Sequence, residues 1–167
     1  MSSERPLWQI NTEKLANDIL EQTRSCHNEE EVKMKVEPLL KRTFVQAGID
    51  VNIAEYEKHT AVTAKRMDAV YGYLIIEYKA PCKLSKTTSL KEVKKQLQEY
   101  IEEESHQHGE HAEDFLAKAI GVAIDGSHIL FVRYSKAVRI ISVPVPIPEE
   151  QSDFFPEIAP QKGFQFQ

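Results

Sequence analysis

The sequence lacks the features of disulfide-rich, zinc-binding, membrane and secreted proteins. Its 167 residues include two cysteines, Cys26 and Cys82, without a CxxC or Cys/His spacing, so neither a disulfide framework nor a zinc site is expected. The longest apolar runs, such as LII and ILFV, are far too short to cross a bilayer. The amino end has no basic start followed by an apolar centre, as a secretory signal would. We therefore expect a cytoplasmic protein without a membrane partner.

The composition is that of one globular domain with an uneven charge distribution. Hydrophobic residues make up 41% of the chain and charged residues 28%. The net charge of −5 argues against binding nucleic acid by bulk electrostatics alone. Residues 60–100, however, contain eight basic residues against four acidic ones, a local net charge of +4, and the acidic residues concentrate in the next segment, 102–114. A solvated charged surface is the alternative interpretation of such a run.

Hydrophobic periodicity and turn residues predict a mixed sheet flanked by helices. Helical spacing indicates helices at residues 12–24, 28–47 and 89–104. Extended structure is expected at 51–64, in two strands joined by a turn at Gly72–Tyr73, in a hairpin turning at Asp125–Gly126, and at 138–143. The order helix, helix, strands, helix, strands is typical of an α/β or α+β sandwich.

A change in composition near residue 144 divides the chain. Five prolines, beginning with Pro144 and ending with Pro160, occur where no amphipathic period is visible. We predict a globular domain over residues 1–143 and a proline-rich linker or arm over 144–167. The abrupt end, KGFQFQ, suggests a domain taken from a longer protein.

Two acidic residues and a lysine are predicted to meet on the first hairpin. If Gly72 and Tyr73 form its loop, Asp68 lies opposite Glu77, with Cβ atoms roughly 5 Å apart. Strand alternation puts Lys79 on the same face as Glu77, and Leu74 and Ile76 on the other face. Two carboxylates at that distance repel each other unless a cation lies between them.

Oxygen ligands of this number suit Mg²⁺ or Mn²⁺ rather than zinc. Such an ion polarises a phosphoryl group and lowers the pKa of a bound water, and an adjacent lysine can stabilise developing negative charge. The arrangement therefore favours metal-assisted phosphodiester hydrolysis. A structural ladder of ion pairs on a solvated face is the alternative.

Helix phase singles out a third carboxylate. In the segment NEEEVKMKVEPLL, Glu29 falls in the middle of the apolar stripe formed by Val32, Val36 and Leu39, whereas its two neighbouring glutamates point away. A glutamate in the first turn also complements the helix dipole, which is the competing explanation.

These segments resemble the PD-(D/E)xK nuclease superfamily. RMDAVYGYLIIEYK is similar to its core, with Asp68 as the first acid and Glu77-Tyr78-Lys79 as the ExK element. QLQEY contains Gln96 and Tyr100 in the QxxxY pattern of the RecB-like branch. NEEEVKMKVEPLL resembles the first helix of restriction-type members and aligns Glu29 with the family glutamate. GVAIDGSHILFVR resembles the closing hairpin of nuclease domains attached to restriction subunits and DNA methylases. Lys33 stands where arginine is usual, and Met67 replaces a proline.

The resemblance implies roles for individual residues. Asp68 and Glu77 would bind Mg²⁺ (or Mn²⁺), with the Tyr78 carbonyl as a further ligand. Lys79 would position or activate the attacking water, and Glu29 would hold a metal-bound water. Gln96 and Tyr100 would brace the site or meet the DNA backbone. The expected DNA contacts are Arg66, Lys83, Lys86, Lys91, Lys94 and Lys95. Pairing with Glu57 is the alternative for Arg66.

The implied fold is a restriction-endonuclease-like mixed sheet flanked by helices, and the implied activity is that of a Mg²⁺-dependent DNA endonuclease domain of restriction or defence type. Its partners would be DNA and further domains or subunits of a restriction-modification system, and a homodimer is compatible with this interpretation. The alternative is a catalytically inactive module of the same fold that binds DNA or a partner subunit. RNA or branched DNA could replace duplex DNA as the substrate.

Overall fold

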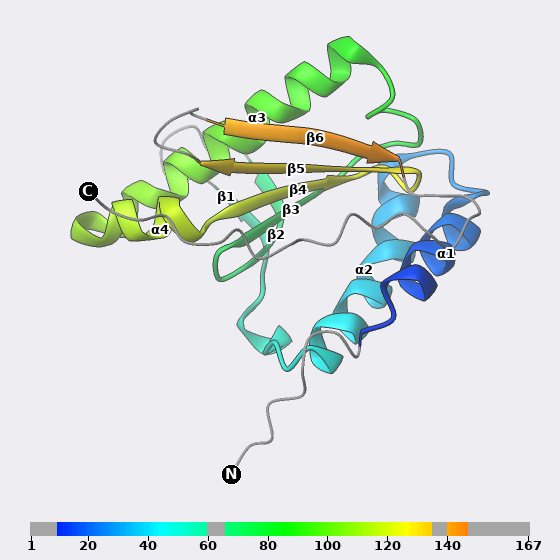
Figure 1. Ribbon diagram of the computed structural model, residues 1–167, viewed down its shortest axis with the longest axis horizontal. Helices are drawn as coiled ribbons and strands as arrows, with labels where there is room; N and C mark the ends of the chain where they lie inside the picture. Colours follow the sequence, from blue (N-terminus) through cyan, green and yellow to red (C-terminus); the bar gives the residue numbers. More distant parts are fainter. Residues whose placement is uncertain (1–9, 60–65, 135–139, 147–167) are drawn as a thin grey trace, which may run out of the picture.

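A mixed β-sheet organises the chain. The computed structural model describes residues 10–59, 66–134 and 140–146 (Figure 1). In these residues six strands form one sheet in the order β1 to β6. The strands are β1 (Glu55–His59), β2 (Arg66–Tyr71), β3 (Leu74–Tyr78), β4 (Ile120–Ile124), β5 (His128–Tyr134) and β6 (Ile140–Pro146). Neighbouring strands are antiparallel except β3 and β4, which are parallel.

Helices cover both faces of the sheet. The α-helices are α1 (Thr12–Thr23), α2 (Glu29–Gln46), α3 (Thr87–His106) and α4 (Ala112–Lys118). Side chains of β3 alternate between the two faces: Ile75 packs in a buried cluster with Leu97 of α3, and Ile76 packs in a second cluster with Val36 of α2. The α1–α2 pair and the α3–α4 pair therefore lie on opposite faces, and α3 and α4 form the crossover between the parallel strands β3 and β4 (Figure 1). The predicted sandwich is confirmed.

Local sequence explains the helix ends. The Asn28 side chain caps α2 by accepting the Glu31 N–H, and Gly48, with a φ of 76°, follows its carboxyl end. The cap of α1 is Asn11, whose side chain accepts the Lys14 N–H at 2.8 Å, so Thr12 is the first helical residue.

The two predicted hairpins form, and their surroundings contain short helices that the sequence did not indicate. Gly72 has a φ of 59° at the β2–β3 turn, and Gly126 has a φ of 88° in the turn between β4 and β5. A 3₁₀ turn at Val51–Ile53 precedes β1, and another at Gly109–His111 leads into α4. α4 has 7 residues, too few for an apolar period to stand out in an acidic segment.

The carboxyl end of the sheet extends past the predicted domain boundary. β6 runs to Pro146, so it includes Pro144 and Pro146, while the remainder of the predicted arm lies outside the described residues. Among the described strands, β6 pairs with β5 alone, and edge strands accept proline where the missing N–H would face away from the neighbouring strand. Among the described helices, none combines the length and apolarity needed to traverse a bilayer.

Candidate active site

The Asp68 side chain ends the regular pairing between β2 and β3. The ladder contains the pairs Tyr71–Leu74, Val70–Ile75 and Ala69–Ile76, in the register expected from the turn. One position further, the Asp68 Oδ2 accepts a hydrogen bond of 2.8 Å from the Tyr78 N–H. A carboxylate thus satisfies a strand N–H beyond the last regular pair. This bond fixes Asp68, 8% exposed, against the end of β3.

Glu77 is the most deeply buried acid of the site. It is 4% exposed, and its Oε1 accepts hydrogen bonds from Lys79 Nζ at 2.7 Å and Gln96 Nε2 at 2.8 Å. Its Oε2 is buried and has no hydrogen-bond partner among the described residues. Burial raises the pKa of Glu77 to about 7, the negative charges of Asp68 and Glu29 add to this effect, and Lys79 opposes it.

The QxxxY pair braces this carboxylate from α3. Gln96 and Tyr100 lie one turn apart, and the Gln96 Nε2 donates to both the Glu77 Oε1 and, at 2.6 Å, the Tyr100 hydroxyl. Tyr100 in turn donates to the Arg66 carbonyl at 2.7 Å, which ties α3 to the start of β2. Tyr100 is 1% exposed, and its burial raises its pKa to about 12. Of the two predicted roles, the geometry therefore supports bracing.

Lys79 connects the sheet to the first residue of α2. Its ammonium lies 2.7 Å from Glu77 Oε1 and 3.8 Å from Glu29 Oε2. The backbone N–H of Lys79 donates to the Ile124 carbonyl at 2.8 Å. This bond continues the parallel pairing with β4 past the end of β3. The Glu29 side chain is 50% exposed, so it faces the site from its open side. The structure thus brings together Glu29, Asp68, Glu77 and Lys79.

Tyr78 contributes to the site only through its backbone. Its side chain lies in the buried cluster on the α2 face, and its hydroxyl has no hydrogen-bond partner among the described residues. Burial raises the pKa of this hydroxyl far above its usual value. The N–H of Tyr78 bonds to Asp68, which leaves the carbonyl as the only group with which Tyr78 could bind a metal.

A second charged cluster, which the sequence did not reveal as part of the site, lies behind Asp68. The Lys33 ammonium of α2 bonds to Glu57 Oε1 and lies 3.5 Å from Asp68 Oδ1. Arg66 Nε lies 2.6 Å from Glu57 Oε2, so the predicted alternative for Arg66, pairing with Glu57, is confirmed. The hydrogen bond from Lys33 lowers the pKa of Glu57. Burial alone would lower the pKa of Lys33, but Glu57 and Asp68 together raise it.

The carboxylates suit a hard cation that is bound by two acidic side chains. They do not form a metal site of the kind that requires three acidic side chains. No group of three or more Asp, Glu, His or Cys side chains arranged for a metal occurs in the described part of the chain. Asp68 Oδ2 and Glu77 Oε1 already accept protein hydrogen bonds. The buried Glu77 Oε2, however, has no hydrogen-bond partner among the residues that the structure describes, as expected of an oxygen that a cation completes. Mg²⁺ is commonly bound by one or two carboxylates together with water and substrate phosphate.

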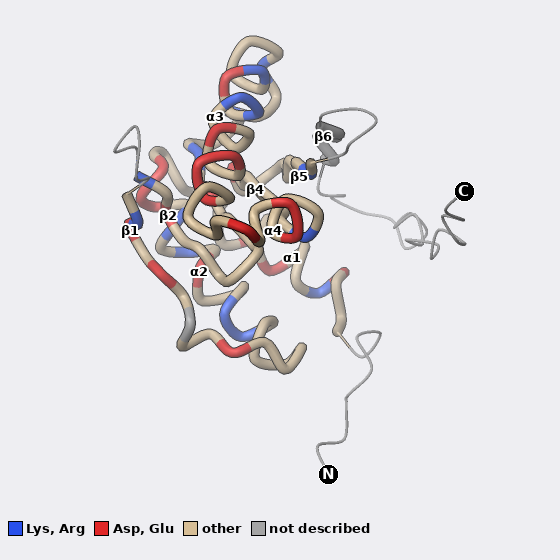
Figure 2. Tube along the Cα trace, turned by 90° about the vertical axis from the view of Figure 1, so that its left-hand side faces the viewer, with Lys and Arg blue, Asp and Glu red and all other residues tan. Residues whose placement is uncertain are grey.

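The predicted DNA-contacting lysines lie on the loop after β3 and on the first half of α3. Lys86, Lys91 and Lys95 are exposed, and Lys83 and Lys94 are partly exposed. Figure 2 shows basic residues on the turns of α3 near its amino end and acidic residues on the later turns. A depression of about 450 Å³ beside Gln96 and Tyr100 is lined by two cations, Arg66 and Lys95, and by Glu92 and Glu99.

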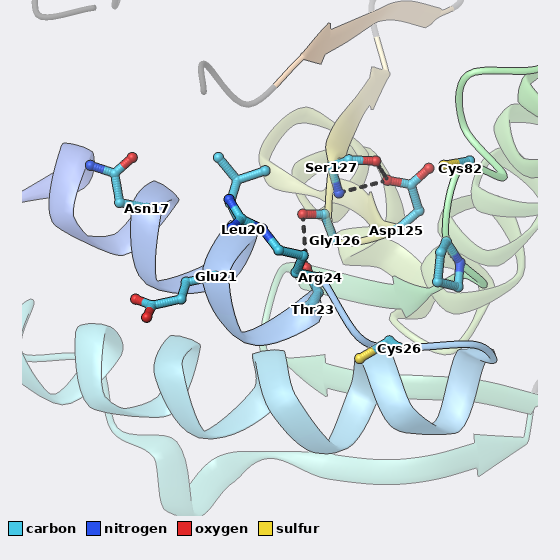
Figure 3. A pocket seen from close by; sticks show the side chains of 11 residues that line it. Asn17, Leu20, Glu21, Thr23, Arg24, Cys26, Cys82, Asp125, Gly126 and Ser127 are labelled. Carbon is cyan, nitrogen blue, oxygen red and sulfur yellow. Dashed lines mark hydrogen bonds between the residues drawn. The ribbon is translucent and has the colours of Figure 1, made fainter. Parts of the chain in front are cut away.

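A larger pocket lies apart from the carboxylates. It has a volume of about 650 Å³ and is lined by the last turns of α1, both cysteines and the β4–β5 turn (Figure 3). None of the predicted site residues lines it. Asp125, 1% exposed, lies in its wall, but its oxygens accept the N–H groups of Leu84, Ser127 and His128. This buried acid anchors a turn and is not available for chemistry.

Comparison with known proteins gave no further assignment. No family model matches the chain, and neither curated proteins nor solved structures gave a match. The resemblance to PD-(D/E)xK nucleases therefore stays a prediction, and the function has to follow from the site itself.

Proposed function

We propose that this chain is a Mg²⁺-dependent nuclease domain that hydrolyses DNA phosphodiester bonds, with Mn²⁺ as an alternative ion. The observation that carries the proposal is Glu77: a buried carboxylate with one oxygen fixed by Lys79 and Gln96 and the other, Oε2, without a partner. Such an atom destabilises a protein unless a ligand uses it. The adjacent Asp68 and Glu29 add negative charge to that of Glu77, and a bound cation would relieve the repulsion that Lys79 offsets only in part.

Asp68 and Glu77 would hold the ion, with the Tyr78 carbonyl as a further ligand. When bound, the ion supplies Lewis-acid polarisation of a phosphoryl oxygen and a lowered pKa of a bound water. Side chains of the protein would orient the attacking water and stabilise the developing charge. Lys79, whose charge is already beside Glu77, would orient the attacking water and stabilise negative charge on phosphate oxygens. Glu29, half exposed at the mouth of the site, would accept a hydrogen bond from that water.

The charge distribution of α3 supports a polyanionic substrate. Helix dipoles favour acids near the amino end and bases near the carboxyl end. α3 departs from this pattern: Lys86 is the N-cap residue without a capping hydrogen bond, the first turn has no acid, and Glu103 and Glu104 share the last turn with His106. The ion pair with Lys58 accounts for Glu104 at the carboxyl end, but the helix dipole does not explain the basic residues near the amino end. Contact with phosphates beside the carboxylates does, and phosphate contacts position the duplex without reading its sequence.

The resemblance suggests the wider setting of the activity. Nuclease domains of this kind occur in restriction subunits and DNA methylases, so we propose DNA as the substrate and further domains or subunits of a cytoplasmic restriction-modification system as partners. A homodimer is compatible with this setting. The sequence preference would then be supplied outside the described domain, because lysines that contact phosphates position DNA without reading its sequence.

The proposal is tested by incubating plasmid and linear duplex DNA with the chain and Mg²⁺ or Mn²⁺, with single-stranded RNA and branched DNA as parallel substrates. We expect metal-dependent cleavage of DNA that Asp68→Asn and Lys79→Met abolish. Lys118→Met is the matched control, because Lys118 is a lysine on α4 paired with Asp114 at 2.7 Å, outside the site. Cleavage that survives both site substitutions would exclude the assignment, and cleavage of RNA or branched DNA alone would change the substrate.

A catalytically inactive module that binds DNA or a partner subunit is the second candidate. The observation in its favour is that protein donors already occupy Asp68 Oδ2 and Glu77 Oε1, with Lys33 beside Asp68 Oδ1. Titration calorimetry with Mg²⁺ separates the two candidates. Binding that Asp68→Asn removes supports the nuclease, whereas no binding, together with retained affinity for DNA in EDTA, supports the module.

A further inference from the structure

Lys33 and Glu57 form a cation–anion pair on the far side of Asp68, and no role proposed above uses it. The Lys33 side chain is 13% exposed, and its ammonium is shared between two carboxylates, Glu57 Oε1 in direct contact and Asp68 Oδ1 at 3.5 Å. The ammonium is therefore held mainly by Glu57, and only secondarily by Asp68. Because Asp68 is a proposed metal ligand, the position of this charge bears on how strongly the site attracts a cation.

The backbone at Glu57 is arranged to make this contact. Glu57 has a φ of 53°, a left-handed conformation that few residues other than glycine adopt. The β1–β2 pairing contains Tyr56–Ala69 and Lys58–Met67 but omits the pair between them, which would be Glu57 with Asp68. Backbone strain of this kind persists only where surrounding contacts enforce it. Here those contacts are the pairs of Glu57 with Lys33 and Arg66.

We propose that Lys33 and Glu57 are positioning residues that set the cation affinity of the Asp68–Glu77 site, an inference that rests on the proposed function. In the metal-free protein, Lys33 partly neutralises Asp68. Glu57 draws the same ammonium away from Asp68 and so limits its competition with an incoming cation. Removing the lysine should strengthen metal binding, and removing the charge of Glu57 should weaken it.

A purely structural ion pair predicts something different. If the pair only supported the fold, loss of either partner would disturb Asp68 in a similar way, and metal affinity would fall in both variants. The two explanations thus differ in the sign of the Lys33 effect. They also differ in the double substitution: if Glu57 acts through Lys33, its replacement has no further effect on affinity once the lysine is gone.

The experiment is titration calorimetry of the full chain with Mg²⁺, repeated with Mn²⁺. The variants are Lys33→Met, Glu57→Gln, the double substitution and Asp68→Asn, with Lys33→Arg as the conservative replacement. Lys35→Met is the matched control, an exposed lysine two residues along the same helix. We expect Lys33→Met to lower the dissociation constant on the order of tenfold, since it removes a unit charge 3.5 Å from a ligand oxygen. Glu57→Gln should raise the constant several-fold, the double substitution should match Lys33→Met, and Lys33→Arg and Lys35→Met should match the unaltered chain.

Thermal unfolding in EDTA supplies a readout that needs no metal. Lys33→Met should lower the melting temperature there, because Asp68 loses its nearby cation, while saturating Mg²⁺ should raise it by more than in the unaltered chain. If Lys33→Met does not fold, Lys33→Gln, which keeps a hydrogen-bond donor for Glu57, takes its place in the same comparison.

The possible failures are distinguishable. If the unaltered chain binds no metal, or if Asp68→Asn leaves binding unchanged, the proposed function falls and the inference falls with it. If binding is present and depends on Asp68, but Lys33→Met and Glu57→Gln shift affinity in the same direction or not at all, only the inference is overturned. The inference is supported if Lys33→Met lowers the dissociation constant for Mg²⁺, Glu57→Gln raises it, and the double substitution has the same constant as Lys33→Met.

Discussion

Glu77 should make the stability of the metal-free protein depend on pH. The pKa of this carboxyl rises from 4.5 to about 7 on folding, mainly because burial disfavours its charge. The folded state therefore binds the Glu77 proton more tightly than the unfolded state does. By linkage, its contribution to stability is fully present below pH 4.5, decreases as the pH rises towards about 7, and is lost above that value. At about 1.36 kcal/mol for each pH unit, the total decrease is about 3 kcal/mol.

The perturbation is Glu77→Gln, which keeps the shape of the protonated side chain and removes the titration. Urea unfolding in EDTA, measured from pH 4.5 to 8.5, gives the free energy of unfolding of each protein. We expect the unaltered chain to lose about 3 kcal/mol more than Glu77→Gln across this range. Lys118→Gln is the control, because Lys118 lies on α4, outside the site, and is paired with Asp114 at 2.7 Å; the raised pKa of its ammonium lies above the range measured.

Parallel curves for Glu77→Gln and the unaltered chain would refute the reasoning, since they would mean that ionisation of Glu77 is not penalised by burial. Addition of Mg²⁺ at pH 8 tests the link to function separately. The ion should restore the stability lost by the unaltered chain and leave Glu77→Gln almost unchanged. A failure of that second step alone would contradict the metal site and leave the account of the buried charge intact.

Three further outcomes follow from the same contacts. Tyr100→Phe should lower the free energy of unfolding by about 1–2 kcal/mol in urea titrations, because the Arg66 carbonyl loses the donor that lies 2.7 Å away; an unchanged value would mean that water replaces it. Lys91→Gln should weaken DNA binding and lower the salt dependence of the logarithm of the binding constant by about 1, as removal of one phosphate contact does, whereas Lys118→Gln should leave both unchanged. Gly126→Ala should lower the melting temperature by several degrees, because a Cβ there would lie 2.6 Å from the Thr23 hydroxyl in a backbone with a φ of 88°; a melting temperature like that of the unaltered chain would show that the turn can shift.

Much of the fold and the centre of the site could be predicted because short-range rules govern them. A glycine at the first position of a two-residue turn fixes the β2–β3 register, and the register fixes which residues share a face. Helix periodicity predicts that Gln96 and Tyr100 share a face of their helix, and they lie one turn apart, hydrogen-bonded to each other, with Gln96 also bonded to Glu77. Glu29 followed from helix phase and from the resemblance, and it lies beside Lys79.

What could not be predicted depends on contacts between distant segments. Lys33 and Glu57 are separated by 24 positions in sequence, and only the packing of α2 against the β1 end of the sheet brings them to Asp68. The left-handed backbone at Glu57 leaves no signal in a strand of ordinary composition. The use of Asp68 as an acceptor for the Tyr78 N–H also escaped prediction, because a pairing pattern describes backbone partners and not a carboxylate that replaces one.

The buried carboxylates of the site are unfavourable for the stability of the fold, but their arrangement suits the binding of a cation. A buried pair such as Asp68 and Glu77 would ordinarily be replaced by apolar or hydrogen-bonding residues, because each uncompensated charge in the interior destabilises the fold by several kcal/mol. Here the chain instead surrounds the pair with cations at graded distances, 2.7 Å for Lys79 to Glu77 and 3.5 Å for Lys33 to Asp68, and still leaves Glu77 Oε2 without a partner. Cations that were present only to support the fold would be expected to satisfy every oxygen. Among the described residues, buried oxygens without a hydrogen-bond partner also occur on Glu57 and on the Tyr78 hydroxyl. Of these, only the Glu77 oxygen lies between the proposed ligand Asp68 and the bracing residue Gln96, as expected of a site whose last partner comes from solution.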